Sequence, residues 1–542
     1  MIYTAINIGP IVPTLNMVRK PRELWAASLF FSQMMKSIID AIPENCKLIS
    51  PAKDEKTEKL GVGLYPDRIF VQGDFDYDTI RNKVIKNYAE AIEVPKIRKG
   101  DVVINGYEIV KGYVNLMHVQ KDIEASESVA IKELNQIMDW MELNNRETDE
   151  THRNGILKFI QKGYDSPLFG MVYSDNKYAE GNNTLAEIAT KQLLNIDATK
   201  WKEAQDFGKR VEKAEDAYQR ANQIFNTNDD INNFEDAFYI KLKEQFPNDI
   251  RSYHKYICII QADGDNMGKT FTHKDLKNDE MREISSLLLQ FDKEATKAIL
   301  EYGGFPIYAG GDDLLFIAPV VGMTKDKEGK YHNILDLLDQ IDEKFSSVEN
   351  MVKTMGLKDD DKNPIIPSMS YGLSISYYKY PLYEAFSSAR KQLFEVAKNV
   401  KGKNALAWEL KKHSGSSFSG SFSKSDLFDQ FKEIINNSSV KESLVSAVSH
   451  KIRQNEGLLS LWLDDNDYAT RNKCFFEQYL DYKEEDKYKS SVLKLLNKLY
   501  LLHNDDNSQD ENKKDRTSVL ISQLYGMLRT AKFIRGEEVI DE

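Results

Sequence analysis

The stretch Ile307-Tyr308-Ala309-Gly310-Gly311-Asp312-Asp313-Leu314-Leu315-Phe316-Ile317 is the part of this chain that indicates its fold. Two apolar runs with the composition of β-strands meet at a pair of glycines, which permit a tight reversal with positive φ. The two aspartates at the tip supply hard oxygen ligands of the kind that Mg²⁺ prefers. The stretch predicts a hairpin that serves phosphoryl transfer, although turns also collect Gly and Asp for backbone reasons alone.

A second acidic motif lies upstream of this hairpin. The apolar run 256–262 reads as a buried strand, and it delivers Asp263-Gly264-Asp265-Asn266-Met267-Gly268-Lys269 at its carboxyl end. A helical pattern over 284–300 connects this acidic turn to the hairpin. The order strand, acidic turn, helix, acidic hairpin resembles that of the palm domain of nucleotidyltransferases.

The palm order predicts that Asp263 and Asp313 come together and share divalent metal ions. Two ions, Mg²⁺ or Mn²⁺, would activate the attacking 3′-oxygen and stabilise the leaving pyrophosphate. Asp312 is expected either to orient the turn or to bind the second ion, so the catalytic and metal-binding set is Asp263, Asp312 and Asp313. Asp265 is read first as a turn or helix-capping residue. Further candidates for nucleotide binding are Gly264, Asp265, Asn266, Met267, Gly268, Lys269, Gly310, Gly311, Ser370 and Gly372.

A third element follows the hairpin. Residues 367–376 alternate as a strand, residues 382–397 repeat at helical spacing, and residues 405–408 form the next strand. Lys398 and Lys403, which precede that strand, are candidates for holding a triphosphate. Lys401 is more simply a solvated residue that complements a helix end.

Together these motifs resemble the large polymerase-like subunit of type III CRISPR effectors. The motifs are Ala-Asp-Gly-Asp-Asn-Met-Gly-Lys, Gly-Gly-Asp-Asp, Ser-x-Gly, and Ala-Lys with Gly-Lys-Asn. The opening of the chain, with Ile8-Gly9-Pro10-Ile11, the run 19–28 and Gly63-Leu64-Tyr65-Pro66-Asp67-Arg68-Ile69-Phe70, is similar to the Cmr-type (III-B) branch. The matching motifs span about residues 1–410.

The resemblance implies an α+β multidomain protein with two ferredoxin-like palm domains that hold nucleotides between them. Only the second palm is expected to be catalytic, because the first strand, residues 2–8, ends in Gly9-Pro10 without an aspartate. Arg19, Arg22 and Ser28 are then expected to bind or position nucleotide. The alternative is that residues 24–30 form a core-facing helical stripe and that the arginines are solvated.

The same resemblance implies the activity and the partners. The expected reaction converts ATP, in response to target RNA, to a second messenger, most often cyclic oligoadenylate. The alternative acceptor is S-adenosylmethionine, which would give an AMP conjugate. The expected partners are the other Cmr-type subunits, guide CRISPR RNA and target RNA. A stand-alone cyclic-dinucleotide cyclase and a non-catalytic scaffold are the rival interpretations.

Composition limits these ideas. The 542-residue chain carries a formal charge of −12, from 73 Lys and Arg against 85 Asp and Glu, so RNA contacts are expected in local patches or through partner subunits. Cys46, Cys258 and Cys474 are far apart, which predicts neither a disulfide nor a zinc site. The sequence contains no His-Asp dipeptide, so an HD-type DNase is not predicted. No apolar run reaches membrane-spanning length, so a soluble cytoplasmic protein is expected.

Five regions are expected along the chain. The first palm occupies 1–120, with a strand pair over 107–119, and a helical insertion follows over 121–249. The catalytic palm occupies 250–412, and the Ser- and Gly-rich segment 413–423 reads as a flexible linker. A C-terminal helical domain over 424–542 completes the chain. By resemblance this domain docks a small helical subunit, while its apolar stripes are equally well explained by internal packing.

Overall fold

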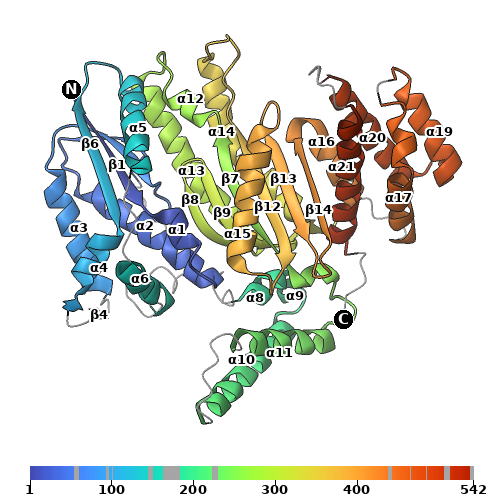
Figure 1. Cartoon of the computed structure of the whole chain (residues 1–542), viewed down its shortest axis with the longest axis horizontal. Helices are drawn as coiled ribbons and strands as arrows, with labels where there is room; N and C mark the ends of the chain where they lie inside the picture. Colours follow the sequence, from blue (N-terminus) through green and yellow to red (C-terminus); the bar gives the residue numbers. More distant parts are fainter. Residues whose placement is uncertain are drawn as a thin grey trace.

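The computed structural model describes residues 1–53, 60–92, 97–99, 102–144, 150–162, 184–221, 230–436, 442–463, 465–483, 485–505 and 513–536. Two large sheets with their helices and a group of C-terminal helices follow one another along the long axis of the molecule, and part of a helical insertion projects below them (Figure 1). Within these residues no helix is both long enough and apolar enough to cross a membrane.

The first sheet has the strand order β2-β3-β1-β6. Its strands are β1 (Ile2–Gly9), β2 (Lys47–Ser50), β3 (Arg68–Gln72) and β6 (Asn115–Asp122), and α2 (Pro21–Ala41) and α3 (Tyr77–Ile92) connect them. Numbered in chain order, the strands are arranged 2-3-1-4, which is the order of a ferredoxin-like βαββαβ unit. The predicted first palm is therefore present as a fold.

The second sheet repeats this arrangement and extends it by two strands. Its order is β14-β13-β12-β7-β9-β8. The ferredoxin-like part consists of β7 (Tyr256–Asp265), α13 (Asn278–Tyr302), β8 (Phe305–Gly310), β9 (Asp313–Pro319), α14 (Ile334–Met355) and β12 (Ser368–Tyr377). β13 (Ala405–Lys411) runs parallel to β12, and β14 (Ser417–Ser423) runs antiparallel to β13.

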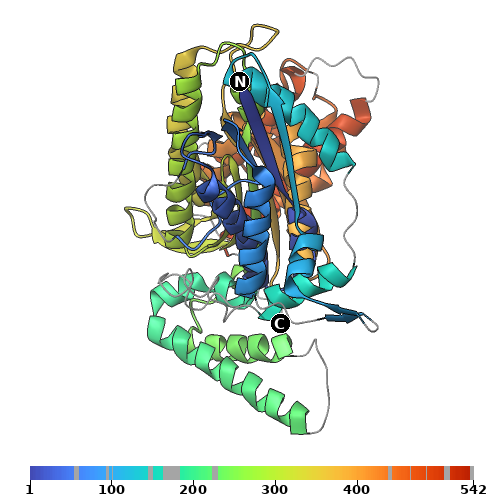
Figure 2. The ribbon, with the colours of Figure 1, turned by 90° about the vertical axis from the view of Figure 1, so that its left-hand side faces the viewer.

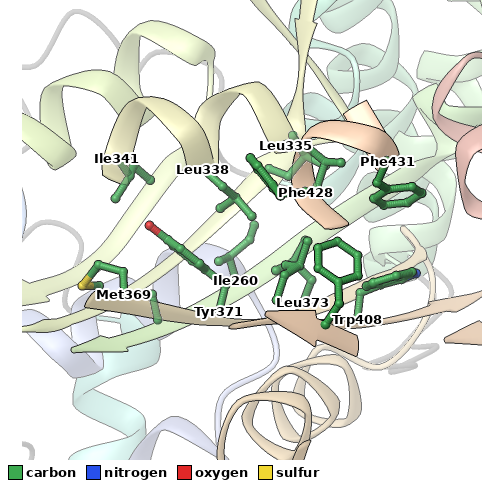
Figure 3. Packing of buried hydrophobic residues seen from close by; sticks show 14 of the residues in the cluster. Ile260, Leu335, Leu338, Ile341, Met369, Tyr371, Leu373, Trp408, Phe428 and Phe431 are labelled. Carbon is green, nitrogen blue, oxygen red and sulfur yellow. The ribbon is translucent and has the colours of Figure 1, made fainter. Parts of the chain in front are cut away.

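The second sheet is the middle layer of the molecule because its two faces belong to two different cores. Cys258, Ile260 and Ala262 of β7 pack with α13, α14 and the C-terminal helices, as the close view in Figure 3 shows for Ile260, Leu338 and Phe431. The alternate residues Ile257 and Ile259 pack with α2 and the insertion. Strand alternation therefore divides one β-strand between two hydrophobic cores.

The insertion and the C-terminal region are helical, as the sequence predicts. The insertion contains α5 (Glu127–Leu143), α6 (Glu150–Lys162), α8 (Leu185–Ala189), α9 (Lys191–Ile196), α10 (Ala198–Ala221) and α11 (Asp230–Gln245), and the last two project from one end of the molecule (Figures 1 and 2). The C-terminal helices are α16 (Lys424–Asn436), α17 (Glu442–Gln454), α18 (Glu456–Ser460), α19 (Tyr468–Leu480), α20 (Lys487–Asp505) and α21 (Lys513–Ile534). The Asn- and Asp-rich segments 226–229 and 506–512, whose composition predicts polar loops, lie outside the described residues.

The prediction of a flexible linker over 413–423 is wrong, because Ser417–Ser423 form the edge strand β14. Composition misleads here, since the small residues serve packing. A Cβ on Gly420 would lie 2.4 Å from the ring of Trp408, and one on Gly526 of α21 would lie 2.3 Å from the carbonyl oxygen of Ser419. Two glycines thus let a tryptophan and a covering helix approach the strand.

The expected strand pair over 107–119 is only half correct. Its first part is the helix α4 (Gly106–Tyr113), and only the second part is a strand, β6. The side chain of Asn105 accepts a hydrogen bond from the amide of Glu108 at 2.9 Å and so caps the helix. This N-cap is the local signal that the strand interpretation missed.

Candidate active site at the β8–β9 hairpin

The hairpin between β8 and β9 has a two-residue loop, Gly311-Asp312, between the paired residues Gly310 and Asp313. Gly311 has φ +76°, as the sequence predicts for one of the two glycines. Gly310 has a different role, since a Cβ there would lie 2.5 Å from the Tyr308 hydroxyl. The Gly311 amide donates to the carboxylate of Asp292 at 2.9 Å, which ties the loop to α13.

The tip of the hairpin rests on the end of β7. The amide of Gly264 donates to the carbonyl oxygen of Asp312 at 3.0 Å. A Cβ on Gly264 would lie 2.6 Å from the Cβ of Asp312, so only glycine permits this approach. Gly264 therefore serves the contact between the two acidic motifs.

Asp263 and Asp313 are opposite one another on β7 and β9, as the palm order predicts. Their carboxyl groups are in hydrogen-bonding contact. Burial and the negative charge of Asp263 raise the pKa of Asp313 well above its usual range, and the same two causes raise the pKa of Asp312 to about 7. The structure thus concentrates three carboxyl groups whose mutual repulsion a bound cation would relieve.

Lys398 supplies the positive charge of this cluster. Its ammonium forms an ion pair with Asp263, donates to the carbonyl oxygen of the same residue at 2.9 Å and lies 2.7 Å from Oδ1 of Asp265. The ammonium therefore bridges the two acids of the β7 motif.

Asp265 is a fully buried strand residue, so its interpretation as a turn or capping residue is wrong. Its Oδ2 accepts hydrogen bonds from Ser368 at 2.8 Å, Ser370 at 2.7 Å and the Asn404 amide at 2.9 Å. Burial acts to raise the pKa of Asp265, but Lys398 and the serine hydroxyls outweigh it and lower that pKa. Asp265 and Ser370 bind each other and hold Lys398 in place.

An irregular helix brings Lys398 to this position. α15 (Leu382–Lys391) continues as a π-helical turn over Gln392–Val396 and a 3₁₀ turn over Ala397–Asn399. A Cβ on Gly372 of β12 would lie 2.3 Å from the amide nitrogen of Leu393, so the π-helical turn rests directly on the strand backbone. Gly372 is therefore a packing residue, and its close contact with the π-helical turn positions Lys398 relative to β12. π-helical turns are frequent at functional sites.

The cluster fits a divalent ion through two carboxylates. No group of three or more His, Cys, Asp or Glu side chains in the described ranges is arranged to hold a metal ion. The Asp263–Asp313 pair nevertheless offers the hard oxygen donors that Mg²⁺ takes when substrate phosphates complete its coordination. Its repelling charges are the observation that favours a cation there.

The other candidates of the β7 motif lie just beyond the acids. Asn266 is the N-cap residue of α12 (Met267–Phe271) and has φ +63°. Its side-chain amide donates to the carbonyl oxygen of Ile366 at 2.9 Å. Met267 is buried, whereas Gly268 faces open space and Lys269 lies 3.8 Å from Asp359. Lys403 has φ +55° in the turn before β13.

The three candidates in the first palm do not lie at the acidic cluster. Ser28 is buried in α2, with its carbonyl oxygen against Gly63. Arg19 and Arg22 line a cavity beside Tyr378, at the end of β12 that pairs with the beginning of β7. Asp263 lies near the other end of that strand.

Sequence reasoning missed Asp292. This aspartate lies on the buried face of α13 among Leu288, Phe291 and Ala295, and its Oδ1 has no hydrogen-bond partner in the described residues. Burial raises its pKa well above the usual range. The signal available in the sequence was an acidic residue within the apolar stripe of a predicted helix.

Comparison with known proteins agrees with this geometry. Residues 256–407 match the family model described as Cas10/Cmr2, second palm domain. The Cmr2 subunit of the Cmr CRISPR system of Pyrococcus furiosus is 33% identical over 187 residues, which are 30% of this chain and 19% of that protein.

Two solved structures share the fold over almost the whole chain. The type III-B Cmr-beta complex in its apo state matches with a TM-score of 0.55 and 12% identity, over 99% of this chain and 82% of the other. The same complex bound to cognate target RNA matches with a TM-score of 0.50 and 11% identity, over 99% and 83%.

The fold and the paired carboxylates define a palm-domain protein related to nucleotidyl cyclases and polymerases. Within that class, residues 256–407 are similar to the second palm domain of Cas10/Cmr2 proteins.

Proposed function

We propose that this chain is the nucleotidyltransferase subunit of a Cmr-type, RNA-guided antiviral complex, and that its second palm converts ATP to cyclic oligoadenylate when target RNA is bound. The observation that carries the proposal is the contact between Asp263 and Asp313, with Lys398 fixed beside them. Guide RNA, target RNA and the other Cmr subunits are the partners that the relationship to Cmr2 supports.

The residues of the site have separate tasks in this proposal. Asp263 and Asp313 would hold divalent Mg²⁺ or Mn²⁺, which supplies activation of a 3′-hydroxyl and charge stabilisation of the leaving pyrophosphate. Asp292 and Gly264 hold the tip of the hairpin, so that Asp312 and Asp313 keep their positions. Lys398, anchored by Asp265, places one positive charge beside the reacting phosphates.

The test is mass spectrometry of the products made by the reconstituted complex from ATP with Mg²⁺ or Mn²⁺. We expect cyclic oligoadenylate only with target RNA, and no product from the double variant Asp312→Ala, Asp313→Ala. The variant should assemble normally, because carboxylates at a hairpin tip contribute little to folding. Asp429→Ala, at an exposed position on α16, is the matched control and should retain wild-type turnover.

Two results would contradict the proposal in different ways. An AMP conjugate that forms only when S-adenosylmethionine is added would keep the site and replace the product. Wild-type turnover in the double variant, or no product from an intact complex with target RNA, would refute the catalytic assignment.

A further inference from the structure

A cavity lies at the end of the second sheet that is opposite to the acidic cluster. It has a volume of about 560 Å³, within the range of small-molecule sites. Its walls come from the beginning of α2, from the segment Tyr378–Tyr383 between β12 and α15, and from the insertion helices α8, α10 and α11. In Figure 1, α8 lies at the lower end of the sheet, and α12 lies at the upper end. α12 directly follows the acidic end of β7.

Strand register separates this cavity from the catalytic acids. Ser370 pairs with Asp263, and Tyr378 follows Ser370 by eight residues along β12 and its extension. At about 3.3 Å per residue the two places are roughly 26 Å apart. One nucleotide cannot occupy both.

The cavity is lined by five cationic side chains and three glutamates, among them Arg19, Lys20 and Glu235. Arg19 and Lys20 line it, and neither side chain makes an ion pair or hydrogen bond with the residues that the structure describes. α2 begins there at Pro21 and α15 begins there at Leu382, and neither N-terminus has a side-chain cap. Two helix N-termini and two cations favour an anionic group such as phosphate.

The cavity also holds a buried carboxyl group that lacks a hydrogen bond. Glu235 of α11 is 4% exposed, and it makes no hydrogen bond with any described residue. Burial raises the pKa of Glu235 to about 8, although the charges of Lys379 and Lys20 act to lower it. A buried polar group without a hydrogen bond is unfavourable. A ligand that brings a hydroxyl or amino group would supply the missing bond.

Aromatic side chains complete the walls. Phe234 and Tyr378 are buried, and the hydroxyl groups of Tyr380 and Tyr383 both donate to Glu384, at 2.6 and 3.0 Å. These two bonds hold the half-buried Tyr380 and the exposed Tyr383 in place beside the cavity. Fixed aromatic rings beside cations are the surfaces on which nucleobases stack.

We propose that this cavity binds a nucleoside phosphate as a second, non-catalytic nucleotide site. The phosphate lies against Arg19, Lys20 and the beginnings of α2 and α15. The base contacts the aromatic wall, and a hydroxyl or amino group of the nucleoside donates to Glu235.

Equilibrium dialysis of labelled AMP against the full chain tests this proposal. EDTA in the buffer removes the divalent ions that nucleotide binding at the acidic cluster needs. We expect saturable binding of one AMP per chain, unchanged by Asp312→Ala with Asp313→Ala. The double variant Arg19→Ala, Lys20→Ala should weaken binding at least about tenfold, since it removes two charge-assisted contacts. Glu235→Gln should weaken AMP binding without weakening that of inorganic phosphate.

The control is Lys132→Ala with Lys391→Ala, which removes two exposed cations elsewhere and should bind AMP as the wild type does. Thermal melts of every variant verify folding. Three outcomes would overturn the site: no saturable binding of AMP, wild-type affinity in the Arg19/Lys20 variant, or equal affinity for AMP and inorganic phosphate.

Discussion

At the scale of single residues, the acids of the two motifs lie in two different environments. Asp263 and Asp313 face each other with few compensating donors, whereas Asp265 binds two serine hydroxyls, one backbone amide and Lys398. These contacts engage both oxygens of the carboxylate, three at Oδ2 and Lys398 at Oδ1. Asp265 therefore acts through Lys398, which it positions.

Lys398→Ala should lower the free energy of unfolding by about 3–5 kcal/mol, because it leaves the buried Asp265 without its cation. Urea denaturation measures the loss. Adding Asp265→Asn should restore part of the stability, since no buried charge then remains. Lys391→Ala, an exposed position on the same segment, should change stability by less than about 0.5 kcal/mol. Equal losses in the single and double variants would argue against this ion pair.

The raised pKa of Asp312 predicts a pH dependence of stability. Its pKa is about 7 in the folded protein and about 3.9 in the unfolded chain, so the folded state holds the proton more tightly. Without divalent ions, Asp312 therefore destabilises the fold increasingly as pH rises from 4 to 7, and constantly above 7. Asp312→Asn should gain stability relative to wild type over that window in urea titrations. A stability difference that does not depend on pH would contradict the assignment.

At the scale of elements, the placement of Lys398 depends on the contact between β12 and the π-helical turn. Gly372 permits this contact, and the turn advances the chain so that Lys398 reaches both acids of β7. The sequence predicted a regular helix here, because an added residue in a helical turn leaves the apolar spacing almost unchanged.

Gly372→Ala should cost about 1–3 kcal/mol, as overpacking does, and should reduce ATP turnover by displacing Lys398. Gly457→Ala is the control, since a Cβ at this helical glycine meets nothing within 4 Å. Unfolding titrations and product assays should separate the two variants. Full turnover in Gly372→Ala would show that the distance between β12 and the π-helical turn does not matter for the reaction.

Prediction from the sequence succeeded where apolar periodicity and turn residues agree. It found the opposition of Asp263 and Asp313 from the order of the acidic motifs, whereas the ferredoxin-like palms came from the resemblance to the family. It failed for β14, where serines and glycines make room for Trp408 and α21, and for Asp292, whose partner Gly311 lies on another element. It also expected Arg19 and Arg22 to bind or position nucleotide between the palms, and the structure places both in a cavity away from the acidic cluster. Distance across a sheet is not visible in a sequence.

At the scale of the whole molecule, the catalytic sheet is shared by two cores and is stabilised from both sides. Trp408 packs on Phe422 and Phe431, so the C-terminal helices complete the core of the palm, in agreement with internal packing of their apolar stripes.

Removal of residues 424–542 should therefore expose the apolar surface around Trp408 and destabilise the remaining palm. We expect binding of a hydrophobic dye and aggregation of the shortened chain at concentrations where the full chain is monodisperse. Light scattering measures the difference. A monodisperse 1–423 chain with an unchanged melting temperature would contradict this account.

The first palm also touches the hairpin itself, through one backbone contact. Gly63 bridges Tyr308 on the free edge of β8, and its carbonyl oxygen accepts from the Ala309 amide at 3.0 Å. Gly63 in turn lies against Ser32 of α2, too close for any side chain. The first palm therefore contacts the strand of the hairpin through its main chain. A rotation of the first palm would displace β8 at Ala309, four residues before Asp313.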